Sequence, residues 1–137
     1  MTVRITGLFA AGAIAAMQFT SPGAHAAAPN NYVCAISEVQ ECRMNGSCRR
    51  IPPQTINLAP IMTLDIKKKE LASLSLLEKE RTEAIEGLKA TDDHVFMHGL
   101  QDEETWSAVI SRKNGSFTGS ISTLEAGFAF FGHCAPN

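Results

Sequence analysis

Residues 94–134 read HVFMHGLQDEETWSAVISRKNGSFTGSISTLEAGFAFFGHC, and this stretch decides the fold class. Turn residues separate four runs of strand length, which lie at 94–100, 105–112, 116–123 and 127–134. In the second run Trp106, Ala108 and Ile110 alternate with polar or small residues, which places Trp106 on the apolar face. Asn114-Gly115 is a strong hairpin signal, because both residues tolerate the positive φ of a two-residue turn. The stretch therefore predicts an antiparallel meander.

Two extended segments are expected before this meander. The first covers 32–37 and leads into a cysteine-containing loop. The second covers 61–66, where alternation puts Met62, Leu64 and Ile66 on the core face.

The segment 67–90 supports two interpretations. It is rich in Lys, Glu, Leu and Ala, and its leucines fall near helical spacing, which favours a helix. Arg81 interrupts that apolar stripe and Gly87 lies close to the proposed helix end. The alternative is a strand at 70–76, a charged turn at 77–81 and a strand at 82–88. Both interpretations stay open at this point.

The N-terminus has the three parts of an export signal. One positive charge at Arg4 precedes a charge-free apolar run at 5–19, and small residues end in Ala24-His25-Ala26. We expect cleavage between Ala26 and Ala27, which makes 1–26 a signal peptide and 27–137 one mature domain. The run is too short to span a membrane, and no cysteine follows the cleavage site directly, so no membrane or lipid anchor is expected. The predicted location is the periplasm or the extracellular space.

The chain contains four cysteines, at 34, 42, 48 and 134. In a short exported chain an even number of cysteines predicts disulfides, and four cysteines allow three pairings. We favour Cys42 with Cys48, around a turn at Asn45-Gly46, and Cys34 with Cys134, which would join the first and last elements. A zinc site is disfavoured because no cysteine pair has the spacing of a zinc knuckle.

The same segments carry a resemblance to a known group of proteins. Its elements are an early Cys with a Cys-x5-Cys loop, Leu-Asp-Ile at 64–66, Glu-Thr-Trp-Ser-Ala-Val-Ile at 104–110, Asn-Gly-Ser-Phe-Thr-Gly at 114–119 and Phe-Gly-His-Cys-Ala-Pro at 131–136. Together they resemble small, uncharacterised exported proteins of Gram-negative bacteria that contain cysteines and are built from β-strands. In such relatives the segment that matches 67–90 is usually a strand, a turn and a strand. The resemblance implies no activity for any residue.

With 67–90 taken as strands, the count reaches about eight. An up-and-down meander of this size can close on itself and bring its first strand beside its last. The predicted fold class is therefore all-β, a small antiparallel meander that closes into a barrel or curved sandwich. An α+β fold with a helix within 67–90 is the alternative.

Composition excludes some partners and leaves few candidate sites. Twelve basic and 14 acidic residues give a net charge of −2, so the chain has no cationic surplus for nucleic acid. No catalytic, cofactor or metal site is predicted. Phe131 is the candidate for an exposed interaction surface, because Phe128, Phe130 and Phe131 occupy both faces of the last strand.

We therefore expect a non-enzymatic, soluble and monomeric periplasmic module that binds an unknown protein or small ligand. A first alternative is an envelope hydrolase or metal-dependent enzyme that uses His94, His98 or His133. A second is an inhibitor of an envelope hydrolase, which rests on analogy with other small barrels.

Overall fold

The computed structural model describes residues 27–73 and 81–137. The expected signal peptide with Ala26, positions 74–76 of the expected strand at 70–76 and positions 77–80 of the expected charged turn lie outside the described residues. The described elements are β1 (Asn31–Arg43), β2 (Cys48–Ile51), a 3-10 turn η1 (Pro53–Ile56), β3 (Ile61–Asp65), β4 (Glu70–Ser73), β5 (Arg81–Ala84), β6 (Gly87–Ala90), β7 (His94–Gln101), β8 (Glu104–Ser111), β9 (Ser116–Ser122) and β10 (Ala126–Pro136).

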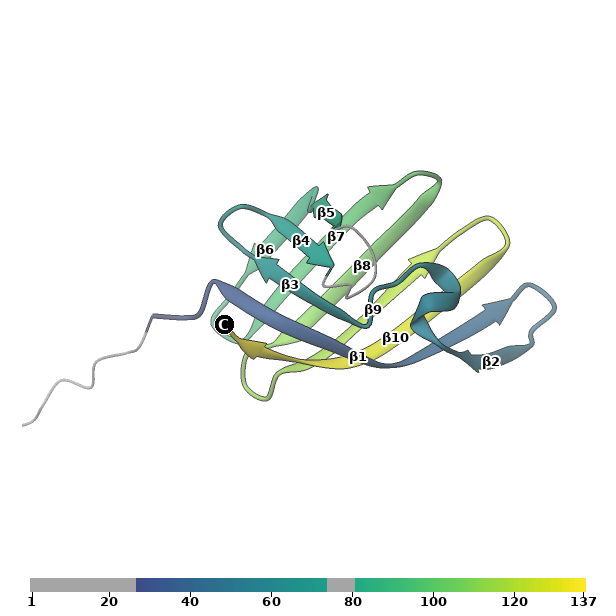
Figure 1. Ribbon diagram of the computed structural model, residues 1–137, viewed down its shortest axis with the longest axis horizontal. Helices are drawn as coiled ribbons and strands as arrows, with labels where there is room; N and C mark the ends of the chain where they lie inside the picture. Colours follow the sequence, from purple (N-terminus) through teal and green to yellow (C-terminus); the bar gives the residue numbers. More distant parts are fainter. Residues whose placement is uncertain (1–26, 74–80) are drawn as a thin grey trace, which may run out of the picture.

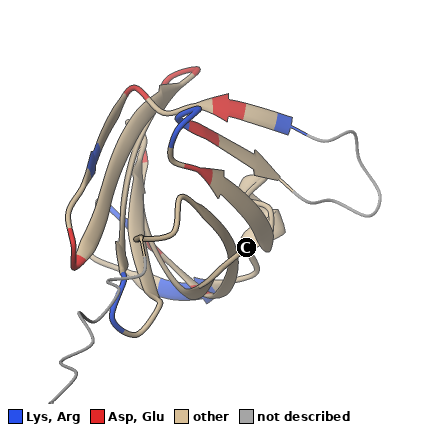
Figure 2. Ribbon diagram, turned by 90° about the vertical axis from the view of Figure 1, so that its left-hand side faces the viewer, with Lys and Arg blue, Asp and Glu red and all other residues tan. Residues whose placement is uncertain are grey.

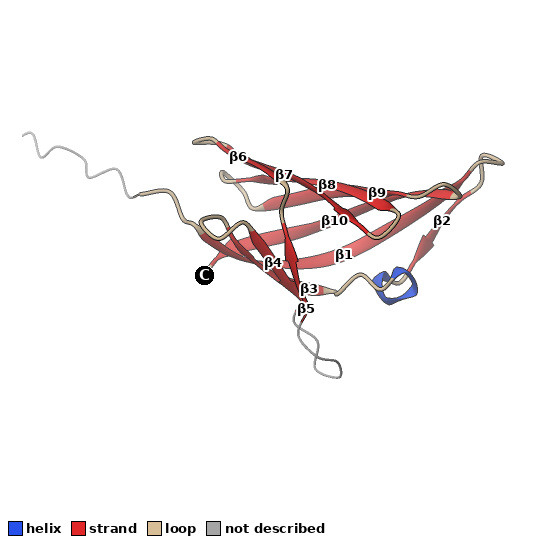
Figure 3. Ribbon diagram, turned by 90° about the horizontal axis from the view of Figure 1, so that it is seen from above, coloured by secondary structure: helices blue, strands red, loops and turns tan. Residues whose placement is uncertain are grey.

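All strand pairs are antiparallel and belong to one sheet. Along the sheet the order is β5-β4-β3-β1-β10-β9-β8-β7-β6, and β2 pairs with the second half of β1 (Figure 1). The sheet curls into a half-barrel, so that β3, β4 and β5 lie across from β7, β8 and β9 (Figure 3). This confirms the predicted all-β class and the antiparallel meander.

The two edge strands of the curled sheet are neighbours in the chain. Only Ile85 and Glu86 separate β5 from β6. The Ile85 N–H donates to the Lys69 carbonyl at 2.8 Å, and the Glu86 N–H donates to the His98 carbonyl at 3.1 Å. These two bonds tie the β4 side of the sheet to the β7 side, so the ends of the sheet meet at this short segment.

The helix considered within 67–90 does not form in the described part of that segment. Residues 67–69 are a turn, and the remainder contributes β4, β5 and β6. The expected strand at 82–88 is divided at Ile85 and Glu86, and Arg81 starts β5 instead of ending the turn. Pairing of β4 with β3 and of β6 with β7 satisfies the backbone groups that a helix would have satisfied internally.

One apolar core lies inside the curl. Its largest fully buried side chains are Phe117, Leu64, Ile110, Val39 and Val95. Met62 and Leu64 are buried and Ile66 packs against the core, as their alternation predicts. Trp106 also packs against this cluster, next to Gly99 on β7, so its expected position on the apolar face is confirmed.

Two disulfides, Cys34–Cys134 and Cys42–Cys48, join the pairs that we favoured from the sequence. Cys34 on β1 and Cys134 on β10 are direct cross-strand partners with a Cα–Cα distance of 4.0 Å, and both are 1% exposed. Cys42–Cys48 closes the hairpin between β1 and β2. A chain with two disulfides suits an oxidising compartment.

Candidate binding site on the outer face

The outer face of β7–β10 carries no Asp, Glu, Lys or Arg side chain. These four fully described strands contain one charged residue, Glu104, which begins β8. The acidic and basic residues of this region lie in the connecting turns instead (Figure 2). Charged residues normally cover an exposed sheet face and are depleted at the centre of interfaces. This face is therefore poor in acidic and basic side chains and rich in serine and threonine.

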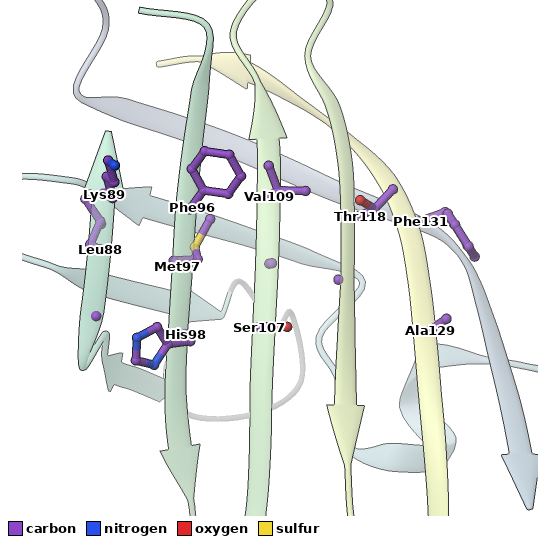
Figure 4. A pocket seen from close by; sticks show the side chains of 13 residues that line it. Leu88, Lys89, Phe96, Met97, His98, Ser107, Val109, Thr118, Ala129 and Phe131 are labelled. Atoms are coloured by element: carbon purple, nitrogen blue, oxygen red, sulfur yellow. The ribbon is translucent and has the colours of Figure 1, made fainter. Parts of the chain in front are cut away.

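One row of side chains crosses this face from strand to strand. Each member is the direct cross-strand partner of the next, and the row consists of Lys89, Phe96, Val109, Thr118, Phe131 and Glu38. Phe96 is 47% exposed and Phe131 is 43% exposed. Figure 4 shows Phe96 and Phe131 on either side of the shorter Val109 and Thr118. From the spacing of adjacent strands, the two phenylalanines stand about 14 Å apart.

The next row along the strands has smaller side chains. It consists of Gly87, His98, Ser107, Ser120 and Ala129. The hydroxyls of Ser107 and Ser120 are 3.1 Å apart and share a hydrogen bond. The His98 imidazole lies over Gly87, where a Cβ atom would be 2.0 Å from its Nε2. This glycine gives the imidazole room to lie flat against the sheet.

The two rows together form an open depression, which we call the outer trough. Its volume is about 760 Å³, and Phe96, Phe131, His98, Val109 and Thr118 are among the residues that line it. A second hollow continues from His98 and Ser107 toward the other end of β8 and β9. The floor is therefore built from short residues of β8 and β9, between taller side chains on β7 and β10.

Hydroxyl groups form part of the floor of the trough: Ser107 and Thr118 line the main hollow, and Thr105, Ser120 and Ser122 line the second hollow. The outward residues of β8 and β9 are Thr105, Ser107, Val109, Ser111, Ser116, Thr118, Ser120 and Ser122. Seven of these eight side chains end in a hydroxyl, which both donates and accepts hydrogen bonds. The site therefore offers uncharged hydrogen-bonding groups flanked by aromatic rings.

Phe131, the residue expected to be exposed, has a second exposed aromatic side chain on the same face. Phe131 lies on the outer face as predicted, but Phe96 was not singled out, although it is the more exposed of the two. Counting charged residues at outward positions would have found the site, because the runs at 94–100, 116–123 and 127–134 contain none.

The three histidines considered for catalysis lie on this same face, in separate places. His94 and His98 flank Phe96 on β7, and the His94 and Phe96 rings are 5.7 Å apart. His133 is on β10, where it pairs with Ser116 and Ala35. Within residues 27–73 and 81–137, no group of three His, Cys, Asp or Glu side chains is arranged to hold a metal ion.

A separate charged cluster occupies the base of the β1–β2 hairpin, on the opposite face of β1 from Glu38. Glu41 is 5% exposed. It accepts hydrogen bonds from Arg49 Nε at 2.6 Å and from Arg43 Nε at 2.9 Å. These bonds, of which the one from Arg49 has the larger effect, lower the pKa of the Glu41 carboxyl from its usual 4.5. Burial of the carboxyl alone would raise its pKa.

This cluster predicts a loss of stability in acid. A carboxyl with a lowered pKa in the folded state stabilises the fold above its unfolded pKa. That contribution disappears as the pH falls below about 4.5 and through the lower folded pKa. We expect the urea midpoint of the wild type to fall over this range, and to fall less in Glu41→Gln, as measured by circular dichroism.

Glu83→Gln is the control for this experiment. Burial raises the pKa of the Glu83 carboxyl, so its charged form costs stability at neutral pH and that cost disappears on acidification. Glu83→Gln should therefore keep or increase the acid loss. Equal acid profiles for the wild type and Glu41→Gln would show that the Glu41 cluster does not contribute.

Comparison of the chain with models of protein families, with curated proteins and with solved structures found no match. Among the described residues, no helix has the length and apolar character needed to cross a membrane.

Proposed function

We propose that this protein is an exported, non-enzymatic binding module whose partner or ligand occupies the outer trough. The observation that carries the proposal is a charge-free face of four strands with two aromatic rings, Phe96 and Phe131, that are each more than two-fifths exposed. Large exposed apolar side chains that gather on one face mark interaction sites. The two disulfides support a role in an oxidising compartment.

A binding role suits the shape of the site better than a catalytic one. Catalysis needs an acid, base or nucleophile within hydrogen-bonding reach of a second functional group. His98, the histidine that lines the trough, lies over Gly87, and the hydroxyl of its cross-strand neighbour Ser107 is hydrogen-bonded to the hydroxyl of Ser120. The trough is open, which suits a ligand that lies along the sheet.

We expect a Phe96→Ser/Phe131→Ser double variant to lose at least about 90% of its binding to the natural partner, because two aromatic contacts disappear together. The measurement is affinity capture from an envelope extract with the mature protein as bait, followed by quantitative mass spectrometry. Because both rings are exposed, the free energy of unfolding should change by less than about 1 kcal/mol.

Ile61→Ser is the matched control. Ile61 lies on β3, in the opposite part of the curled sheet, and is 43% exposed, the same fraction as Phe131. A partner captured by the wild type and by Ile61→Ser, but not by the double variant, supports the proposal. Identical capture by all three baits contradicts it. So does a catalytic turnover that is lost on replacement of one histidine while the circular dichroism spectrum stays unchanged.

A further inference from the structure

We propose that the ligand of the outer trough is an uncharged, polyhydroxylated chain, that is, a neutral oligosaccharide that lies along the hydroxyl-bearing floor between Phe96 and Phe131. The inference rests on the proposed function, because it takes the trough as the binding site. It adds the chemical class of the ligand.

The charges near the trough favour a neutral ligand. Among the residues that line its main hollow, Lys89 is the charged one, and it stands at the β6 margin outside the two phenylalanines. An anionic ligand would need several cations to replace its hydration, and a cationic ligand would need carboxylates. Neither set is present on the outward positions of β7–β10.

The floor favours a ligand rich in hydroxyl groups. Serine and threonine side chains occupy the outward positions of β8 and β9, which alternate with inward residues, except at Val109. Each hydroxyl can donate to and accept from a sugar hydroxyl. The Ser107–Ser120 pair shows that neighbouring floor groups already hydrogen-bond to one another across the strands.

The walls favour a ligand with apolar faces as well as hydroxyls. A sugar ring has carbon-bound hydrogens on its faces and hydroxyls around its edge, so it can contact an aromatic ring and a polar floor together. Phe96 and Phe131 provide the rings, and His98 adds an imidazole on the β7 side. A purely apolar ligand would leave the floor hydroxyls without partners, at a cost in affinity.

The shape of the face disfavours a second copy of this chain as the occupant. Short residues on β8 and β9 lie between the taller Phe96 and Phe131. Two such faces packed together would bring the tall side chains into contact and leave a gap over both floors, whereas close interfaces are packed as densely as protein interiors. A narrow chain that fills the trough avoids this gap.

The test is a titration of the isotope-labelled mature protein, followed by NMR of its backbone amides. The neutral probes are chitotetraose and cellotetraose, and the anionic comparator is tetragalacturonate. We expect a neutral probe to cause saturable shifts at Ser107, Val109, Thr118 and Ser120, with at least about tenfold weaker binding of tetragalacturonate. Phe96→Ser/Phe131→Ser should weaken binding of the neutral probe at least about tenfold.

A second variant tests the floor separately. Ser107→Ala/Ser120→Ala removes two hydroxyls and keeps both phenylalanines, and we expect roughly three- to tenfold weaker binding of the same neutral probe. Ile61→Ser should bind like the wild type. Because all these positions are solvent-facing, the wild-type spectrum of the core amides serves as the check of folding in each variant.

Three results would overturn the assignment: no saturable shift with either neutral probe, equal binding of tetragalacturonate, or shifts that lie outside the trough. If one of these occurs while the phenylalanine variant still loses its partner in the envelope capture experiment, the proposed function stands and the oligosaccharide assignment falls. If the capture experiment fails as well, the trough is not the binding site.

Discussion

A Cys34→Ala/Cys134→Ala variant is expected to lose about 4–5 kcal/mol of its free energy of unfolding. The bridge spans 100 residues and joins β1 and β10, the first and last strands in the chain, which are neighbours in the sheet. In the chain-entropy account, a cross-link over so long a loop restricts the unfolded chain strongly, and the benefit grows with loop length. Single domains have total stabilities of about 5–15 kcal/mol, so this variant should be close to unfolded at 37 °C.

Urea denaturation followed by circular dichroism measures this loss, and Cys42→Ala/Cys48→Ala is its internal comparison. That bridge has a sequence separation of only 6 and lies at the outer hairpin, so its removal should cost about 2 kcal/mol. Losses of equal size, or a larger loss for the short loop, would contradict the view that the long bridge is the main covalent support of the curled sheet.

The second large effect is expected at Phe117. This side chain is 2% exposed on the inner face of β9, and its ring lies 5.4 Å from that of Phe130 on β10. Phe117→Ala removes a ring from the middle of the core and leaves a cavity, which should cost about 3–5 kcal/mol. The measurement is the free energy of unfolding in urea.

Phe131→Ala gives this experiment a matched control. The residue type and the change are the same, but Phe131 lies on the outer face and is 43% exposed. We expect a change of less than about 1 kcal/mol. If the two variants lost similar stability, the assignment of inner and outer faces to β9 and β10 would be wrong.

Alternation is the reason that so much of the meander could be predicted. In a strand, successive side chains point to opposite faces, so Trp106, Ala108 and Ile110 had to share one face whatever their partners were. The hairpin predicted at Asn114-Gly115 forms there, but the connection runs from 112 to 115, and only Gly115, with a φ of +74°, has the positive φ expected of both residues in a two-residue turn. The same argument placed Met62 and Leu64 in the core. These are local properties that a single strand or turn carries on its own.

The secondary structure of the segment 67–90 could not be predicted from local preferences. Its residues suit a helix and a strand almost equally, because leucine, lysine and glutamate favour helices while the short apolar runs also fit strands. Neighbours in the sheet resolve the ambiguity. β3 and β7 offer backbone groups to β4 and β6, and Ile85, which is 4% exposed, fills the core between them.

The outer trough depends on register in the same way. Phe96 and Phe131 are 35 positions apart in the chain, and four strands must pair in one particular register to put them in a single row. A shift of one residue in any pair would move a phenylalanine out of the row and turn outward side chains toward the core. Sequence patterns identified Phe131 as an exposed aromatic, but they did not identify the neighbours that form the trough with it.

The amino-acid sequence thus carries the strand faces, the turns and the favoured cysteine pairs in itself, because periodicity and turn chemistry act over a few residues, and a meander that curls round can bring its first and last strands together. The strand state of 67–90 and the composition of the trough arise only when distant strands pair. Hydrogen bonding between those strands sets the register, and the register decides which side chains are neighbours. The helix, strand or turn preference of a single segment does not determine it.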